Sequence, residues 1–146
     1  MFFALVAVAL LPSAGCRRPR PDLSVAEHAL ETGAVGQALA EFDRVAAQKL
    51  TPPAERARAL TGAALACERL GDGAGAESRL GLAIDPDVPG ASEPALFYLA
   101  ERLRTRDPAR ALNLYYRAAA GAEQHRGGAF PYRAASERIL QLSMSR

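Results

Sequence analysis

Residues 60 to 83 constrain the fold more than any other stretch, because their apolar residues follow a helical spacing twice, on either side of one turn. The first set recurs at i, i+3, i+4 and i+7, as on one helix face, and consists of Leu60, Ala63, Ala64 and Cys67. Gly71 is suited to end that helix, and Asp72 to cap the next one. Spacings of four and three predict a second inner stripe, formed by Ala76, Leu80 and Ala83. The stretch therefore predicts two antiparallel helices joined by a tight turn.

The composition also favours an all-α protein. Apolar residues make up 49% of the chain, and much of that share is alanine, the strongest helix former. A length of 146 residues allows one domain with a modest core. The 18 basic and 16 acidic residues nearly balance, whereas a nucleic-acid-binding domain would concentrate positive charge on one face. We therefore expect a helical domain that does not bind nucleic acid.

The helical pair of residues 60 to 83 has counterparts before and after it. The second helix of each pair is expected to bury a small residue, and these residues are Ala38, Ala76 and Ala111. A larger apolar residue follows each of them at i+4, and these residues are Phe42, Leu80 and Tyr115. Ser92 and Asp107 are expected to cap the two helices of the last pair. The chain thus contains three related helical pairs between residues 22 and 122.

This pattern resembles the tetratricopeptide repeat, a helix–turn–helix unit of 34 residues with small, glycine and aromatic positions at such offsets. The resemblance implies a right-handed solenoid of about three antiparallel helix pairs over residues 22–122. Residues 123–146 are expected to form a C-terminal helix that caps the open end. Two alternatives stay open: a plain antiparallel helical bundle with alanine-rich seams, and a truncated fourth repeat in place of the cap.

The N-terminal residues predict a signal and an anchor. The apolar run Phe2–Leu11 has ten residues, too short to span a bilayer but suited to a signal peptide. Small residues then lead directly to Cys16, which resembles a bacterial lipoprotein signal over residues 1–15. The resemblance implies cleavage before Cys16, a lipid on that cysteine, and an Arg/Pro linker over residues 16–21. An ordinary secretory signal cleaved near Ala14 or Gly15 is the alternative.

The same resemblance implies a location. A lipidated Cys16 followed by Arg17 rather than Asp is similar to lipoproteins that are sorted to the outer membrane. We therefore expect the protein in the cell envelope of a Gram-negative bacterium, at the periplasmic face of the outer membrane. The arginines of the linker either contact anionic headgroups or belong to a solvated tether.

The sequence predicts no enzyme. His28 and His125 lie in different segments, without a metal-binding spacing of His or Cys around them. Cys67 falls on an inner helical stripe and is expected to be a buried structural thiol. No phosphate-binding loop or nucleophile motif occurs. We therefore expect no cofactor, no metal and no small-molecule substrate.

The function implied by the repeat resemblance is that of an adaptor that binds another protein or peptide of the envelope. In such solenoids the first helix of each pair lines a concave groove. The positions that fall on this groove are Glu27, Leu30, Glu31, Thr61, Leu65, Glu68, Arg69, Phe97, Glu101 and Arg104. Leu65 and Phe97 are the expected apolar anchors, since such groups carry most interface energy. Packing of Phe97 against the neighbouring repeat is the alternative for that residue.

Two other functions remain open at this point. One is an obligate structural subunit of an envelope assembly machine, for pilus or outer-membrane protein biogenesis. The other is an accessory protein of a separately encoded cell-wall enzyme. An obligate subunit would tend to aggregate without its partner, whereas an adaptor would be folded and soluble alone.

Overall fold

The computed structural model describes residues 22–85, 87, 91–124 and 129–144. These residues contain helices and no strands, which confirms the all-α prediction for this part of the chain. The helices are α1 (Ser24–Glu31), α2 (Val35–Ala47), α3 (Pro53–Arg69), α4 (Gly73–Ala83), α5 (Glu93–Leu103), α6 (Pro108–Gln124) and α7 (Ala129–Met144). The expected signal peptide, the linker with Cys16, and His125 lie outside the described residues.

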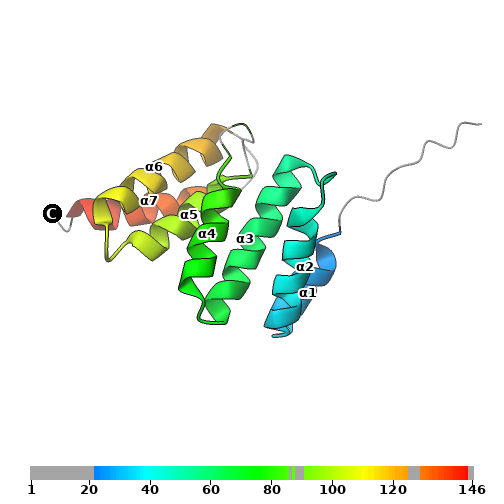
Figure 1. The fold of residues 1–146 in the computed structure, drawn as a ribbon. Coiled ribbons are helices and arrows are strands. Elements are labelled where there is room, and N and C mark those ends of the chain that lie inside the picture. The colour runs from blue at the N-terminus through cyan, green and yellow to red at the C-terminus, as the bar shows by residue number, and fades with distance from the viewer. Residues whose placement is uncertain (1–21, 86, 88–90, 125–128, 145–146) are drawn as a thin grey trace, which may run out of the picture.

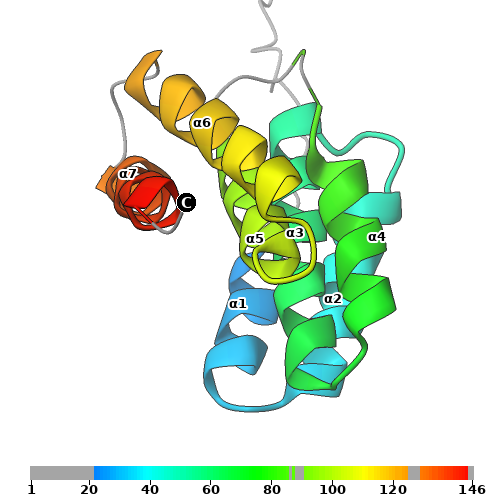
Figure 2. The same ribbon diagram turned by 90° about the vertical axis from the view of Figure 1, so that its left-hand side faces the viewer.

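Each helix packs against the next one along the chain. In Figure 1, α1 to α4 stand side by side, and α5 to α7 follow beyond α4 with their axes turned away from the first four. Figure 2 looks almost along the axis of α7, while α3 and α4 stand upright in the same view. Two further contacts, between α3 and α5 and between α5 and α7, join helices that are not consecutive. The helix α5 therefore touches four other helices.

The turn at Gly71 follows the sequence prediction, and the first pair has the same kind of turn at Gly33. Gly33 and Gly71 have φ values of 85° and 79°, a left-handed conformation that favours glycine. Asp72 caps α4, because its Oδ1 accepts a hydrogen bond of 2.8 Å from the backbone N–H of Gly75. Asp107 caps α6 in the same way, with 3.0 Å from its Oδ1 to the backbone nitrogen of Arg110. Both predicted aspartate caps are thus confirmed.

The predicted cap at Ser92 is wrong. Its side chain makes no capping hydrogen bond to α5. The hydroxyl oxygen instead accepts from the backbone N–H of Asp85 at 2.9 Å and lies 2.9 Å from the carbonyl oxygen of the same residue. Ser92 therefore ties the end of α4 to the start of α5, and a local sequence pattern does not reveal this longer connection.

Buried side chains form two clusters that meet at α3. The smaller one joins α1, α2 and α3 and consists of Leu23, Ala26, Ala29, Ala38, Phe42, Val45, Ala59 and Ala63. The larger one extends from α3 to α7, and its residues from α3 are Ala64 and Cys67. The neighbouring residues Ala63 and Ala64 thus belong to different clusters. Because α3 is rich in alanine, it packs closely on two sides.

The three small residues of the second helices, Ala38, Ala76 and Ala111, are all fully buried. The larger residues that follow them are buried as well, with exposed fractions of 2% for Phe42, 1% for Leu80 and 0% for Tyr115. The inner stripes of these helices are therefore placed as the spacing predicts. In α7, Ala135 is buried, whereas Tyr132 is 44% exposed. The backbone of α7 is non-helical at Phe130.

Candidate functional site

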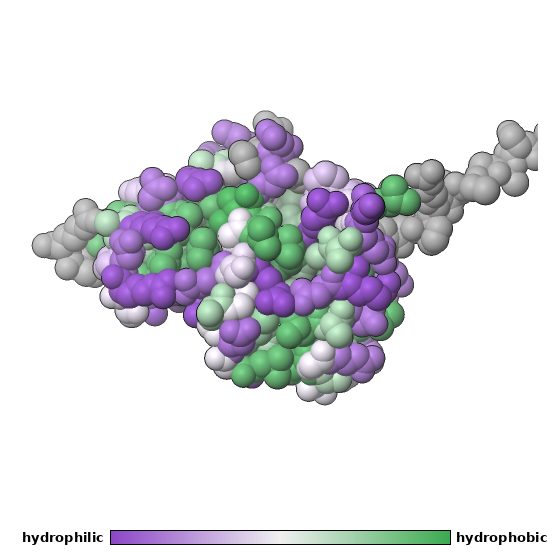
Figure 3. Space-filling model, viewed as in Figure 1, coloured by the Kyte–Doolittle hydropathy of each residue, from purple (hydrophilic) through white to green (hydrophobic). Residues whose placement is uncertain are grey.

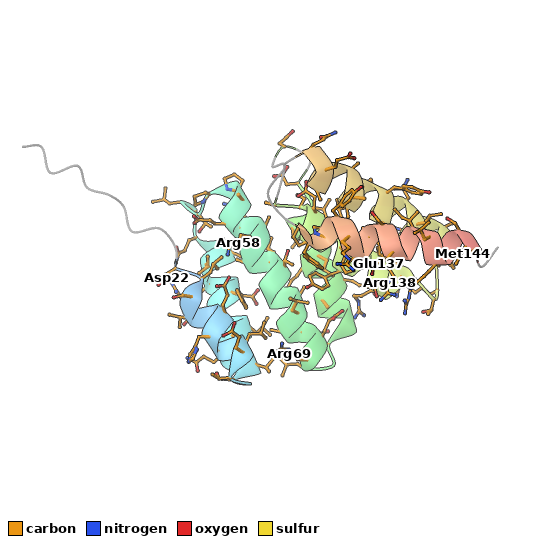
Figure 4. The ribbon with its side chains drawn as sticks, turned by 180° about the vertical axis from the view of Figure 1, so that it is seen from behind. Asp22, Arg58, Arg69, Glu137, Arg138 and Met144 are labelled. Atoms are coloured by element: carbon orange, nitrogen blue, oxygen red, sulfur yellow. The ribbon has the colours of Figure 1, made fainter. Side chains whose placement is uncertain are left out.

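A groove of about 310 Å³ lies on the side of the molecule where α1, α3 and α5 meet. Figure 4 looks at this side, with Arg58 and Arg69 at opposite ends of α3. The described residues that line the groove are Glu27, Leu30, Phe42, Arg58, Thr61, Gly62, Leu65, Ala91, Pro94, Tyr98 and Phe130. Four of the sequence-predicted groove residues, Glu27, Leu30, Thr61 and Leu65, are among them.

The floor of the groove depends on a glycine within α3. A Cβ atom at Gly62 would lie 2.5 Å from Cε1 and Cζ of Phe42, closer than real Cβ atoms come to a neighbour. The missing side chain therefore lets the ring of Phe42, which belongs to α2, reach the groove beneath α3. Sequence reasoning missed this contact because Gly62 carries no turn signal and stands in the middle of a helical pattern.

Aromatic rings form the wall on the α5 side. The ring centroids of Phe97, Tyr98 and Phe130 are 5.3 to 5.9 Å apart, the separation at which aromatic pairs attract one another. Tyr98 is partly buried and Phe130 is 48% exposed, so both rings present surface to the groove. Burial raises the pKa of the Tyr98 hydroxyl, and the negative charge of Glu68 raises it further.

The structure corrects the expectation that Phe97 is a groove anchor. Phe97 is only 8% exposed and packs in the larger core cluster. Its ring lies 5.7 Å from that of Tyr115, which is fully buried on α6. The neighbouring Tyr98 therefore occupies the groove position that the sequence analysis gave to Phe97.

One ion pair lies at the rim of the groove. Nη2 of Arg58 and Oε1 of Glu27 are 3.2 Å apart, and their side chains are 61% and 49% exposed. This pair joins α3 to α1, and both charges remain accessible. Because exposed ion pairs contribute little to stability, a partner could replace either member at small cost. The rim thus offers one charge of each sign beside an apolar floor.

Several other predicted groove charges hold helices together and do not line the groove. Glu68 accepts from Arg102 at 2.8 Å, and a guanidinium nitrogen of Arg69 donates to the backbone carbonyl of Leu30. Glu101 accepts from Arg138 at 2.7 Å and from the Tyr115 hydroxyl at 2.5 Å. These contacts connect residues 14 to 39 positions apart, so the sequence pattern could not show them.

Two other predicted groove residues do not line the groove. Glu31 is exposed near the end of α1, and Arg104 is half-buried directly after α5. Neither is among the described residues that line the groove. Thr61 does line it, but its hydroxyl donates at 2.8 Å to the carbonyl of Ala57 within the same helix. The groups in the groove that can form hydrogen bonds or ion pairs with a partner are therefore mainly Glu27, Arg58 and the hydroxyl of Tyr98.

The described residues offer few groups for other chemistry. No three His, Cys, Asp or Glu side chains among them are grouped so as to hold a metal ion. Burial raises the pKa of the Cys67 thiol, and the side chain is 1% exposed.

None of the helices in the described part is both long and apolar enough to cross a membrane. On the side drawn in Figure 3, apolar residues show as separate patches between hydrophilic ones.

The groove is thus an apolar contact surface with a small polar rim. Its lining residues come from five helices and one loop residue, so its shape depends on how these helices pack. No family model, no curated protein and no solved structure matches this chain.

Proposed function

We propose that the chain is a right-handed solenoid similar to tetratricopeptide repeats, in which α1/α2, α3/α4 and α5/α6 are the pairs and α7 is the cap. The packing of each pair supports this proposal. Further support comes from the burial of the residues at equivalent positions in the three second helices, Ala38, Ala76 and Ala111. The left-handed glycines Gly33 and Gly71 occupy equivalent turns in the first two pairs.

On this basis the protein is a lipid-anchored adaptor of the cell envelope. Its partner is another envelope protein that places one large apolar side chain between Leu65 and Tyr98. The observation that carries the proposal is the apolar groove along the first helix of each pair. The rim pair Glu27–Arg58 suits a partner segment with polar groups of either sign beside the apolar anchor. Such an arrangement is typical of interfaces, in which an apolar centre is surrounded by a polar rim.

The groove predicts where a partner is captured. We expect a photo-crosslinking phenylalanine analogue at position 65 to link the partner in cells, and the same analogue at position 82 to link none. Leu82 is the matched control, because it is 69% exposed on α4 and lies outside the groove. Equal crosslinking from both positions would contradict the groove assignment.

The affinity for the captured partner then tests the anchors. With the purified pair, Leu65→Ala and Tyr98→Ala should each weaken binding by at least about 2 kcal/mol, a roughly 30-fold rise in Kd. Glu31→Ala should cost less than about 1 kcal/mol, because exposed charges at a rim contribute little. Thermal melts must first show that each variant is folded. Unchanged Kd values for both folded anchor variants would reject the proposal.

The anchor on Cys16 is tested separately. We expect mass spectrometry of the protein from the membrane fraction to find an acylated cysteine at the mature N-terminus. Cys16→Ala removes the thiol that carries the lipid, so this variant should leave the membrane fraction. A wild-type protein that is soluble with an unmodified Cys16 would refute lipidation.

A further inference from the structure

The groove lies across a junction in the molecule. One side is built by α1, α2 and α3, and the other by Tyr98 of α5 together with Phe130 of α7. The two sides are joined by the contacts of α5 with α4 and with α3. The width of the groove therefore depends on how α5 is held against these two helices.

Arg102 makes this connection with hydrogen-bonded ion pairs to both helices. Its Nη1 lies 2.8 Å from Oε1 of Glu68 on α3, and its Nε lies 3.4 Å from Oε1 of Glu77 on α4. Arg106 adds a second contact, with 2.6 Å from its Nη2 to Oε2 of Glu77. The side chain of Arg102 is only 25% exposed, so solvent screens these charges less than those of a surface pair. The planar guanidinium suits this task because it can bond two carboxylates at once.

A glycine at the start of α4 makes room for this guanidinium. A Cβ atom at Gly73 would lie 2.5 Å from Nη2 of Arg102. Gly73 does not have a positive φ, so the backbone itself would accept another residue there. The space beside Gly73 is thus occupied by Arg102. By contrast, a Cβ atom at Gly81 on the same helix would meet open space.

The ion pair between Arg102 and Glu68 lies one helical turn beyond the groove residues on α3 and α5. Leu65 and Glu68 are three residues apart on α3, and Tyr98 and Arg102 are four apart on α5, so each pair shares a helix face. Glu68 and Arg102 therefore meet next to the place where Leu65 and Tyr98 face the groove. The influence of the Glu68 charge on Tyr98 agrees with this short separation.

We infer that Arg102 is a positioning residue: seated beside Gly73 and bonded to Glu68 and Glu77, it fixes α5 against α3 and α4 and thereby sets the width of the groove. The inference rests on the proposed function only for the role of the groove. The geometry itself can be measured without any partner.

The experiment measures the distance between spin labels across the groove. The labels are attached to His28→Cys on α1 and Arg133→Cys on α7, two exposed positions, in the full chain carrying Cys16→Ala. In Arg102→Met, which keeps the aliphatic stem, we expect a broader or displaced distance distribution. Gly73→Ala should act in the same direction although it keeps every charge, because the added Cβ displaces the guanidinium. Gly81→Ala is its matched control and should leave the distribution unchanged.

A second label pair separates positioning from general loosening. Labels at His28→Cys and Ser78→Cys, both within the α1–α4 part, should give the same distance in all variants. Arg44→Met removes an ion pair within α2, outside the groove, and serves as the charge control.

An unchanged distance across the groove in folded Arg102→Met and Gly73→Ala would overturn the inference. Equal broadening of both label pairs would overturn it as well, because the arginine would then act on overall stability. Neither result depends on partner capture. The groove can therefore fail to bind a partner while Arg102 still sets its width, and it can bind a partner although Arg102 does not set its width.

Discussion

Replacing Tyr115 by alanine should lower the free energy of unfolding by about 3–5 kcal/mol, the usual loss for a large aromatic residue in a core. Tyr115 is fully buried on α6, and its ring packs 5.7 Å from that of Phe97. The substitution also removes the hydroxyl that donates to Glu101 at 2.5 Å. Denaturant unfolding followed by circular dichroism measures the change.

The adjacent residue provides a matched control. Tyr116 is 52% exposed on the same helix, so Tyr116→Ala should change the free energy of unfolding by about 0.5 kcal/mol or less. Tyr115→Phe isolates the hydroxyl, and a hydrogen bond to a charged group predicts a loss of about 1.5–3 kcal/mol. Similar losses for Tyr115→Ala and Tyr116→Ala would show that α6 does not pack as described.

A second large effect is expected at Leu80 on α4. Leu80→Ala should cost about 2–5 kcal/mol, because a cavity remains where the buried side chain was removed. Leu80 is 1% exposed in the larger core cluster, whereas Leu82, two residues further on the same helix, is 69% exposed. Leu82→Ala should therefore be nearly neutral in the same unfolding experiment. If Leu82→Ala were the more costly substitution, the assignment of Leu80 to the buried face of α4 and of Leu82 to the exposed face would be wrong.

The sequence predicts the inner face of a helix well where the helix buries a single stripe. In α4 the spacing of Ala76, Leu80 and Ala83 was enough, since these three residues are the buried ones. In α5 the same reasoning misplaced Phe97. That helix packs against α3, α4, α6 and α7, so most of its circumference is buried and periodicity no longer distinguishes a groove face.

The charged part of the candidate site was the least predictable. Glu68 and Glu101 fall on suitable helix positions, but each is bound to an arginine more than 30 residues away. Such pairing depends on how the helices cross, which no local pattern contains. Phe130 was missed for a related reason. Its segment is predicted from the sequence only as a C-terminal capping helix, whereas its ring contacts Phe97 and Tyr98 on α5.

The division of α3 between two core clusters has a consequence for local unfolding. Ala59 and Ala63 hold the cluster of α1 and α2, while Ala64 and Cys67 belong to the cluster that extends to α7. If α1 and α2 separate transiently from the rest, α3 loses one set of contacts but stays docked through the other. Proteins open locally in such cooperative units. Because α3 belongs to both clusters, loss of the contacts of α1 and α2 would leave the wall of the groove formed by α3 and α5 in place.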